Sequence, residues 1–196
     1  GRPVRRGGPN SDGSPRSGEE PRPSATDSGP GSTDPGKRRR EARYPWTVPL
    51  TSLDSLDPTV RIRWRVATTP QRLWAGLTEP RMLGLWLGTL TSGSIAPDAS
   101  FVVDHGDGYA CRSTVRSMRT PFSLGYSWRF PDEQDTDLTW GLEEDGDGTV
   151  LTMSHAGLGG LSHSYRDGWL THLTFLEGAV IGHPLPRDMF WPLHGT

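Results

Sequence analysis

The chain lacks several features that define large classes of protein. Cys111 is the only cysteine in 196 residues, so an intrachain disulfide is excluded and a reducing compartment is favoured. No apolar run approaches the roughly eighteen residues that a membrane-spanning helix needs, and the N-terminus has no apolar stretch of the kind found in secretory signals. We therefore expect a cytoplasmic protein with no membrane span.

Metal-site and catalytic patterns are also missing. The six histidines show neither the H-x-H nor the H-E-x-x-H spacing of zinc sites, and one cysteine is too few for a structural zinc centre. The stretch "DGDG" at 145–148 begins like a calcium loop, but the later ligands of such a loop are absent, so it predicts a turn. The sequence thus indicates no metal, no cofactor and no obvious catalytic pair.

Residues 1–43 have almost nothing with which to build a core. They contain no aromatic residue and only three aliphatic ones, Val4, Ala25 and Ala42. Such a segment cannot bury enough apolar surface to offset its conformational entropy, so we expect a disordered tail. Residues 44–57 are expected to link this tail to the folded body.

Charge divides the chain into a basic tail and an acidic body. Ten basic and six acidic residues give residues 1–43 a net charge of +4, which leaves −6 for the rest. The cluster "GKRRREAR" at 36–43 is either a weak anchor for an acidic partner or a solvated charge run, and we favour the second. The acidic body argues against nucleic acid as a partner.

The body begins with a strand whose two faces differ. In "PTVRIRWRVATT" at 58–69, every second residue is apolar and three arginines alternate with them. This pattern places Val60, Ile62, Trp64 and Val66 on one face, which predicts a strand with one buried side.

Two short helices are predicted over residues 69–88. Thr69 can cap a helix that starts at Pro70, in the first turn where proline suits a helix. Pro80 then interrupts the apolar run and opens a second short helix, which Gly88 ends.

The remainder predicts five or six antiparallel strands and then one long helix. Hairpins are expected over 100–117 and 136–155, each with a glycine-rich turn. Between them, "FSLGYSWRF" alternates, which predicts one buried face made of Phe122, Leu124, Tyr126, Trp128 and Phe130. Over 161–182, apolar residues recur every three or four positions, as in an amphipathic helix.

Four stretches of the body occur in an order typical of a known family. They are "ATTPQRLWAGLTEPRMLGLWLG", "FSLGYSW", "EEDGDGTVLTMSHAGL" and "YRDGWLTHLTFLEG". Over residues 58–182 the chain resembles the family named for the activator of the ninety-kilodalton heat-shock protein ATPase, within the START-like (SRPBCC) superfamily. The resemblance implies an α+β helix-grip fold, in which a curved antiparallel β-sheet wraps around a long C-terminal α-helix and two short helices follow the first strand.

The resemblance also implies a cavity between the helices and the concave sheet face, which many relatives use for lipids, polyketides or hormones. The strand alternation and the helical stripe then assign its lining. The expected ligand-binding residues are Trp64, Leu85, Trp86, Phe101, Tyr126, Trp128, Trp140, His155, Tyr165, Trp169 and His172. Each tryptophan taken singly is better explained as core, whereas several rigid rings on one concave face also suit a flat or greasy ligand.

Three histidines need separate consideration. His155 either orients a ligand or acts as a general base, or it has a structural role, bonded to the loop "AGLGG" that follows it; we favour the structural role. We favour a structural role for His172 as well. Asp104 and His105 are adjacent on a predicted strand end, where neighbouring side chains point to opposite faces, which argues against a catalytic pair.

Three functions are compatible with these features. The favoured hypothesis is that the cavity binds a small hydrophobic or aromatic molecule, as a carrier, sensor or sequestering module. A cyclase- or aromatase-like enzyme ranks lower, because the sequence offers no converging pair of polar groups. The third is an interaction domain that stimulates a heat-shock ATPase.

Protein partners are left open. A homodimer or another protein partner is compatible with the sequence. Phe190 and Trp191, in the C-terminal tail 183–196, either strap onto the body or complete a dimer surface.

Overall fold

Eight antiparallel strands form one sheet in the computed structural model, which describes residues 49–56 and 58–194. These residues belong to the unit Pro45–Thr196, and the expectations for residues 1–43 lie outside them. Among the described residues, no helix is both long and apolar enough to cross a membrane.

The strand order across the sheet is β1-β2-β8-β7-β6-β5-β4-β3, so consecutive strands pair with each other except β2 and β3, and β2 pairs with β8 instead. The strands are β1 Leu50–Leu56, β2 Thr59–Val66, β3 Thr89–Gly93, β4 Ser100–Asp104, β5 Ala110–Arg119, β6 Ser123–Trp128, β7 Thr136–Asp145 and β8 Gly148–Ala156.

Two short helices follow β2, as the sequence predicts. Helix α1 covers Pro70–Thr78, and its first turn is capped by the Thr69 hydroxyl, which accepts a hydrogen bond from the Arg72 backbone N–H. Helix α2 covers Pro80–Trp86 and starts at the second proline.

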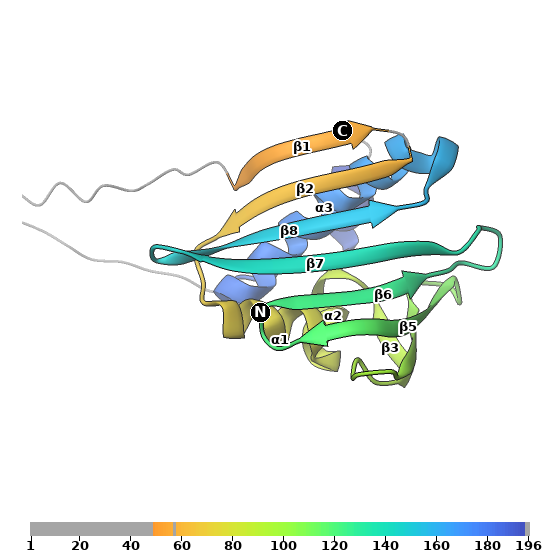
Figure 1. Cartoon of the computed structure of the whole chain (residues 1–196), viewed down its shortest axis with the longest axis horizontal. Coiled ribbons are helices and arrows are strands. Elements are labelled where there is room, and N and C mark those ends of the chain that lie inside the picture. The colour runs from red at the N-terminus through yellow and green to blue at the C-terminus, as the bar shows by residue number, and fades with distance from the viewer. Residues whose placement is uncertain (1–48, 57, 195–196) are drawn as a thin grey trace, which may run out of the picture. The chain divides into compact units, whose positions relative to one another are not determined.

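The long helix α3, Ser162–Ile181, lies against one face of the sheet, and α1 and α2 contact it on the same side (Figure 1). The short 3-10 turn η1, Gly159–Leu161, leads into it. Gly182 ends it in the left-handed conformation, with φ of 91°, which glycine adopts without a steric penalty. This arrangement is the helix-grip α+β fold.

Side chains from neighbouring strands meet in rows on the face that α3 covers. The register aligns Val60 with His155, His155 with Leu138, and Leu138 with Tyr126. All four side chains are buried. Alternation therefore assigns the inner face of β2, β6, β7 and β8 correctly.

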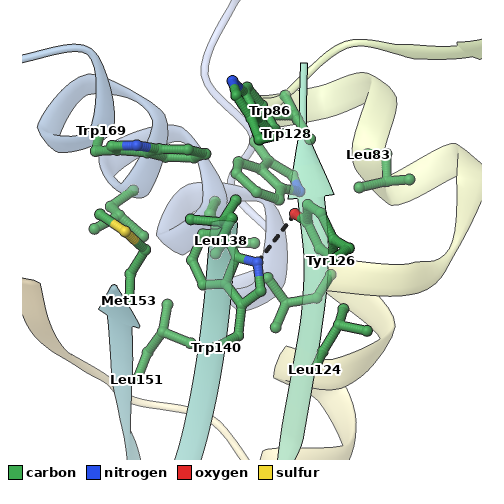
Figure 2. Packing of buried hydrophobic residues seen from close by; sticks show 14 of the residues in the cluster. Leu83, Trp86, Leu124, Tyr126, Trp128, Leu138, Trp140, Leu151, Met153 and Trp169 are labelled. Carbon is green, nitrogen blue, oxygen red and sulfur yellow. Dashed lines mark hydrogen bonds between the residues drawn. The ribbon is translucent and has the colours of Figure 1, made fainter. Parts of the chain in front are cut away.

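Tryptophans dominate the centre of the core. Figure 2 shows Trp140 and Tyr126 pointing toward each other from adjacent strands, with the indole Nε1 of Trp140 donating to the tyrosine hydroxyl at 3.0 Å. Trp86 and Trp169 meet the ring of Trp140 edge to face, with ring centroids 6.0 and 5.5 Å apart. Buried indole N–H groups need acceptors, and the fold supplies them.

Three expectations need correction. Residues 50–56, assigned to a linker by the sequence, form the edge strand β1, whose pattern is broken by a bulge between Leu50 and Ser52. Phe122, expected on the buried face, precedes β6 and is 40% exposed beneath the guanidinium of Arg119. Part of the expected C-terminal tail forms η2, Arg187–Met189, and α4, Phe190–His194.

Candidate functional site

A cavity of about 510 Å³ opens where the sheet, α3 and the C-terminal segment meet. It is lined by side chains from the end of β6, from the turn between β4 and β5, from the first half of α3, and from η2 and α4. Its volume lies in the range of small-molecule sites, which are typically about 300–1,000 Å³.

The sheet contributes an aromatic wall. Trp128 ends β6 and Phe130 follows it, and both rings are almost fully buried. Tyr109, in the turn between β4 and β5, stacks on Phe130 with ring centroids 4.3 Å apart and an angle of 9° between the planes. His105, from the same turn, meets Trp128 and Phe130 edge to face, at 5.4 and 5.1 Å.

Helix α3 supplies the opposite wall through residues spaced three and four apart. Tyr165, Trp169 and His172 therefore share one helical face, and all three line the cavity. The ring of His172 is fixed by a hydrogen bond between Nδ1 and the carbonyl oxygen of Trp86, at 2.7 Å. Because a carbonyl only accepts, the proton of the neutral imidazole is on Nδ1.

The C-terminal segment closes the third side. Phe190 packs against His172 and Phe175, with centroid separations of 4.6 and 5.5 Å, so this segment straps onto the body. Arg187, Trp191 and His194 line the cavity from the same segment. Trp191 is nevertheless 74% exposed, so it forms the rim of the cavity.

A polar network crosses the aromatic lining. The Tyr165 hydroxyl donates to a carboxylate oxygen of Glu133 and accepts from the indole Nε1 of Trp128 at 3.2 Å. Burial and the nearby carboxylate both raise the pKa of Tyr165, so its hydroxyl keeps its proton at neutral pH. Tyr165 and Glu133 can therefore donate or accept hydrogen bonds, but Tyr165 cannot act as a base at neutral pH because it stays protonated.

His155 does not line the cavity, and both nitrogens of its ring form hydrogen bonds. Its Nε2 lies 2.8 Å from the Thr136 hydroxyl, which donates its single proton to the carbonyl oxygen of Trp128. The ring must therefore donate from Nε2, and its Nδ1 accepts from the indole of Trp169 at 3.0 Å. Burial lowers the pKa of His155 to about 3. The role is structural, but the partners are Thr136 and Trp169, not the following loop.

The two histidines on the cavity wall are also neutral at pH 7. Burial, with a smaller contribution from the positive charge of Arg187, lowers the pKa of His105 to about 4 and that of His172 to about 3. His105 Nε2 is buried and has no hydrogen-bond partner in the part of the chain that the structure describes.

The structure brings together four of the residues expected to bind a ligand. Trp128, Tyr165, Trp169 and His172 line the cavity. The other expected residues do not line it and lie elsewhere in the body: Trp64, Leu85, Trp86, Phe101, Tyr126, Trp140 and His155.

Sequence patterns missed most of the remaining lining. His105, Tyr109 and Glu133 are in turns, and Arg187, Phe190 and His194 follow the last long helix, so neither strand nor helix periodicity marks them. The one available signal was the pair Phe190–Trp191 in a segment rich in proline, which indicates a packed strap. No cluster of three metal-ligating side chains occurs within residues 49–56 and 58–194.

Comparison with known proteins identifies the family. A family model described as "Activator of Hsp90 ATPase homolog 1-like protein" matches residues 67–180. The search of curated proteins gave no match.

Several solved structures share the fold. CalU16 from Micromonospora echinospora is 21% identical, with a TM-score of 0.59 over 74% of this chain and 88% of its own. DynU16, whose description places it in the dynemicin biosynthetic locus, is 26% identical, with a TM-score of 0.61 over 66% of this chain and 49% of its own. Protein MLL2253 from Mesorhizobium loti is 21% identical, with a TM-score of 0.60 over 65% of this chain and 99% of its own.

The family match covers more than half of the chain, and the helix-grip fold agrees with it. The chain is therefore a member of the Activator of Hsp90 ATPase homolog 1-like protein family, within the START-like (SRPBCC) superfamily.

Proposed function

We propose that this protein binds a small hydrophobic or aromatic molecule in the cavity between α3, the sheet and the C-terminal segment. The observation that carries the proposal is a cavity of about 510 Å³ with rings of Trp128, Phe130, Trp169 and Phe190 in its walls. Apolar walls with a few polar groups are typical of sites that bury most of a ligand.

The polar groups of the lining suit binding better than general-base chemistry. His105 and His172 are neutral and have pKa values near 4 and 3, far below the pH at which a base operates best. The location of DynU16 in a biosynthetic locus is compatible with a small organic ligand for this chain. A carrier, sensor or sequestering module needs no more than such a cavity.

Blocking the cavity tests this proposal. Ser164 is an exposed residue on the cavity wall, so Ser164→Trp should fill the entrance without disturbing the core. With the neutral dye Nile red as probe, we expect the wild-type protein to brighten and blue-shift the dye, and Ser164→Trp to lose at least nine-tenths of that signal.

A matched variant controls for the added indole. Thr174 is exposed on the same helix and does not line the cavity, so Thr174→Trp should leave dye binding unchanged. Native mass spectrometry of the purified protein provides a second readout, because a co-purified ligand should be absent from Ser164→Trp. A dye signal that Ser164→Trp does not reduce would overturn the proposal.

The cyclase-like alternative has one observation in its favour. The Tyr165 hydroxyl and the Glu133 carboxylate form a hydrogen-bonded pair on the cavity wall, and a tyrosine that keeps its proton can polarise a ligand carbonyl by donating a hydrogen bond. If this alternative is correct, a compound in a small-molecule extract should change in mass when the extract is incubated with the wild-type protein. The same compound should keep its mass when Tyr165→Phe replaces the wild-type protein. Identical spectra for the two proteins would remove this alternative.

A further inference from the structure

The cavity wall contains a cation without a counter-ion. Arg63, Arg65, Arg116, Arg129 and Arg166 each pair with a carboxylate. The side chain of Arg187, which lines the cavity, makes no ion pair or hydrogen bond with any described residue. Arg187 is an exposed residue, and the desolvation of its guanidinium at the cavity wall lowers its pKa.

A second unsatisfied group belongs to a residue that lines the same cavity. His105 Nε2 is buried without a partner among the described residues, and its ring is held by edge contacts with Trp128 and Phe130. A buried polar atom without a hydrogen bond costs free energy, which a ligand can recover. No described residue bonds either nitrogen of the ring, so the neutral imidazole can place its proton on Nε2 and donate it.

Arg187, His105 and His172 line the same cavity. The positive charge of Arg187 lowers the pKa of both histidines. Nδ1 of His172 is already bonded to the Trp86 carbonyl. Arg187 and His105 are therefore the donors available at this end of the cavity, and His172 Nε2 is an acceptor.

The two acidic residues of the lining, Glu133 and Asp107, do not form an ion pair with Arg187. Glu133 accepts the hydrogen bond of the Tyr165 hydroxyl, and Asp107 is at the exposed tip of the turn between β4 and β5. A ligand with a negative group is therefore directed toward Arg187 and away from Glu133. An aromatic body can then lie along Trp169 and Phe190, which flank the same space.

We propose that the cavity selects an aromatic acid, with the acidic group held by Arg187 and His105 Nε2 and the rings against Trp169 and Phe190. This inference rests on the proposed function and specifies its ligand class. Guanidinium groups recognise carboxylates with two parallel hydrogen bonds, which adds geometric selectivity to charge.

Three naphthalene probes with a negative, a neutral and a positive substituent test the inference. The probes are 2-naphthoate, neutral 2-naphthamide and 2-naphthylmethylammonium, each titrated into the 196-residue chain by isothermal titration calorimetry. We expect 2-naphthoate to bind about tenfold more tightly than the amide, as for a charge-assisted hydrogen bond at a partly exposed site. The ammonium probe should bind most weakly.

Variants assign the preference to residues. Arg187→Gln should abolish the advantage of the acid over the amide. His105→Phe keeps the ring contacts and removes the nitrogen, so it should reduce acid binding several-fold. Arg61→Gln is the control, because Arg61 is exposed on β2 and does not line the cavity.

The outcomes separate this inference from the proposed function. If the amide or the ammonium probe binds as well as the acid and Ser164→Trp blocks it, the inference is wrong and the cavity still binds aromatic molecules. If Arg187→Gln retains the preference for the acid, the inference is also wrong. If none of the three probes binds at millimolar concentration, the inference is wrong, and if Nile red does not bind either, the proposed function is overturned as well.

Discussion

The indole of Trp64 donates a hydrogen bond to Glu177 Oε2 at 3.0 Å, which joins β2 to α3 across 113 residues of sequence. Burial raises the pKa of Glu177, whereas the indole bond lowers it, so the charged carboxylate depends on this donor. The bond is one of the side-chain contacts that hold the long helix on the sheet.

Trp64→Phe should therefore destabilise the protein and raise the pKa of Glu177 further. Removing a donor from a half-buried carboxylate costs about 1–3 kcal/mol. Urea unfolding measures the free energy, and NMR titration of the Glu177 carboxyl measures its pKa. Glu177→Gln keeps an acceptor for the indole, so it should cost clearly less than Trp64→Phe; an equal loss would contradict this account.

Close packing of α1 against α3 predicts a strong effect at Gly76. A Cβ atom added there would lie 2.6 Å from Val180 Cγ1, inside van der Waals contact. Gly76→Ala should push the helices apart and cost about 1–3 kcal/mol, as is typical of overpacking. The change is measurable as a lower urea midpoint.

Gly84 offers the matched control for this prediction. It lies in α2, and an added Cβ would meet no atom within 4 Å. Gly84→Ala should stabilise the protein by about 0.5–1 kcal/mol, because alanine loses less backbone entropy in a helix. Equal effects of the two substitutions would show that packing at Gly76 does not matter.

The hydrogen bond between Trp140 and Tyr126 predicts the effect of removing one hydroxyl. Tyr126→Phe keeps the ring but leaves the buried indole N–H of Trp140 without its acceptor. The expected cost is about 1–3 kcal/mol. Tyr165→Phe provides the comparison: its hydroxyl is half-buried at the cavity, so its loss should cost less in the same denaturation assay.

Acid should unfold the protein through its neutral histidines. The pKa of His155 is about 3 when folded and about 6.5 when unfolded, so the unfolded chain binds the extra proton between these values. Stability is therefore full above about pH 6.5 and falls as the pH is lowered, by about 2 kcal/mol at pH 5 for this residue.

His155→Gln isolates this contribution. Glutamine can accept from Trp169 and donate to Thr136, but it does not titrate. Unfolding free energies at pH 7 and pH 5 should differ less in the variant than in the wild type, by about the same 2 kcal/mol. An unchanged pH dependence would assign the effect to His105 and His172 instead.

The sequence predicts a strand correctly where one face of the strand is buried and the other is exposed. In β2, the alternation of Val60, Ile62 and Trp64 with arginines predicts both the strand and its buried face. The strands that were missed, β1 and β3, are the two edges of the sheet, where most side chains are exposed and a bulge interrupts each pairing. Without a buried face, an edge strand leaves no alternating pattern.

The site was predicted only in part, because alternation reports the face of a strand and not the depth of a side chain. Trp140 and Trp128 both point inward, yet Trp140 is enclosed by Trp86 and Trp169, whereas Trp128 reaches the open end. Arg187 lies in the one-turn 3-10 helix η2 and His105 lies in a turn, and both segments are too short to show a period.

The family match ends at residue 180, but Arg187, Phe190, Trp191 and His194 form one side of the cavity. The residues that maintain the sheet and the long helix are thus largely separate from those that complete this wall. Under the proposed function, substitutions at the exposed residues Arg187 and Trp191 are expected to alter ligand choice more than folding. Selectivity would then change independently of the sheet and the long helix that form the scaffold.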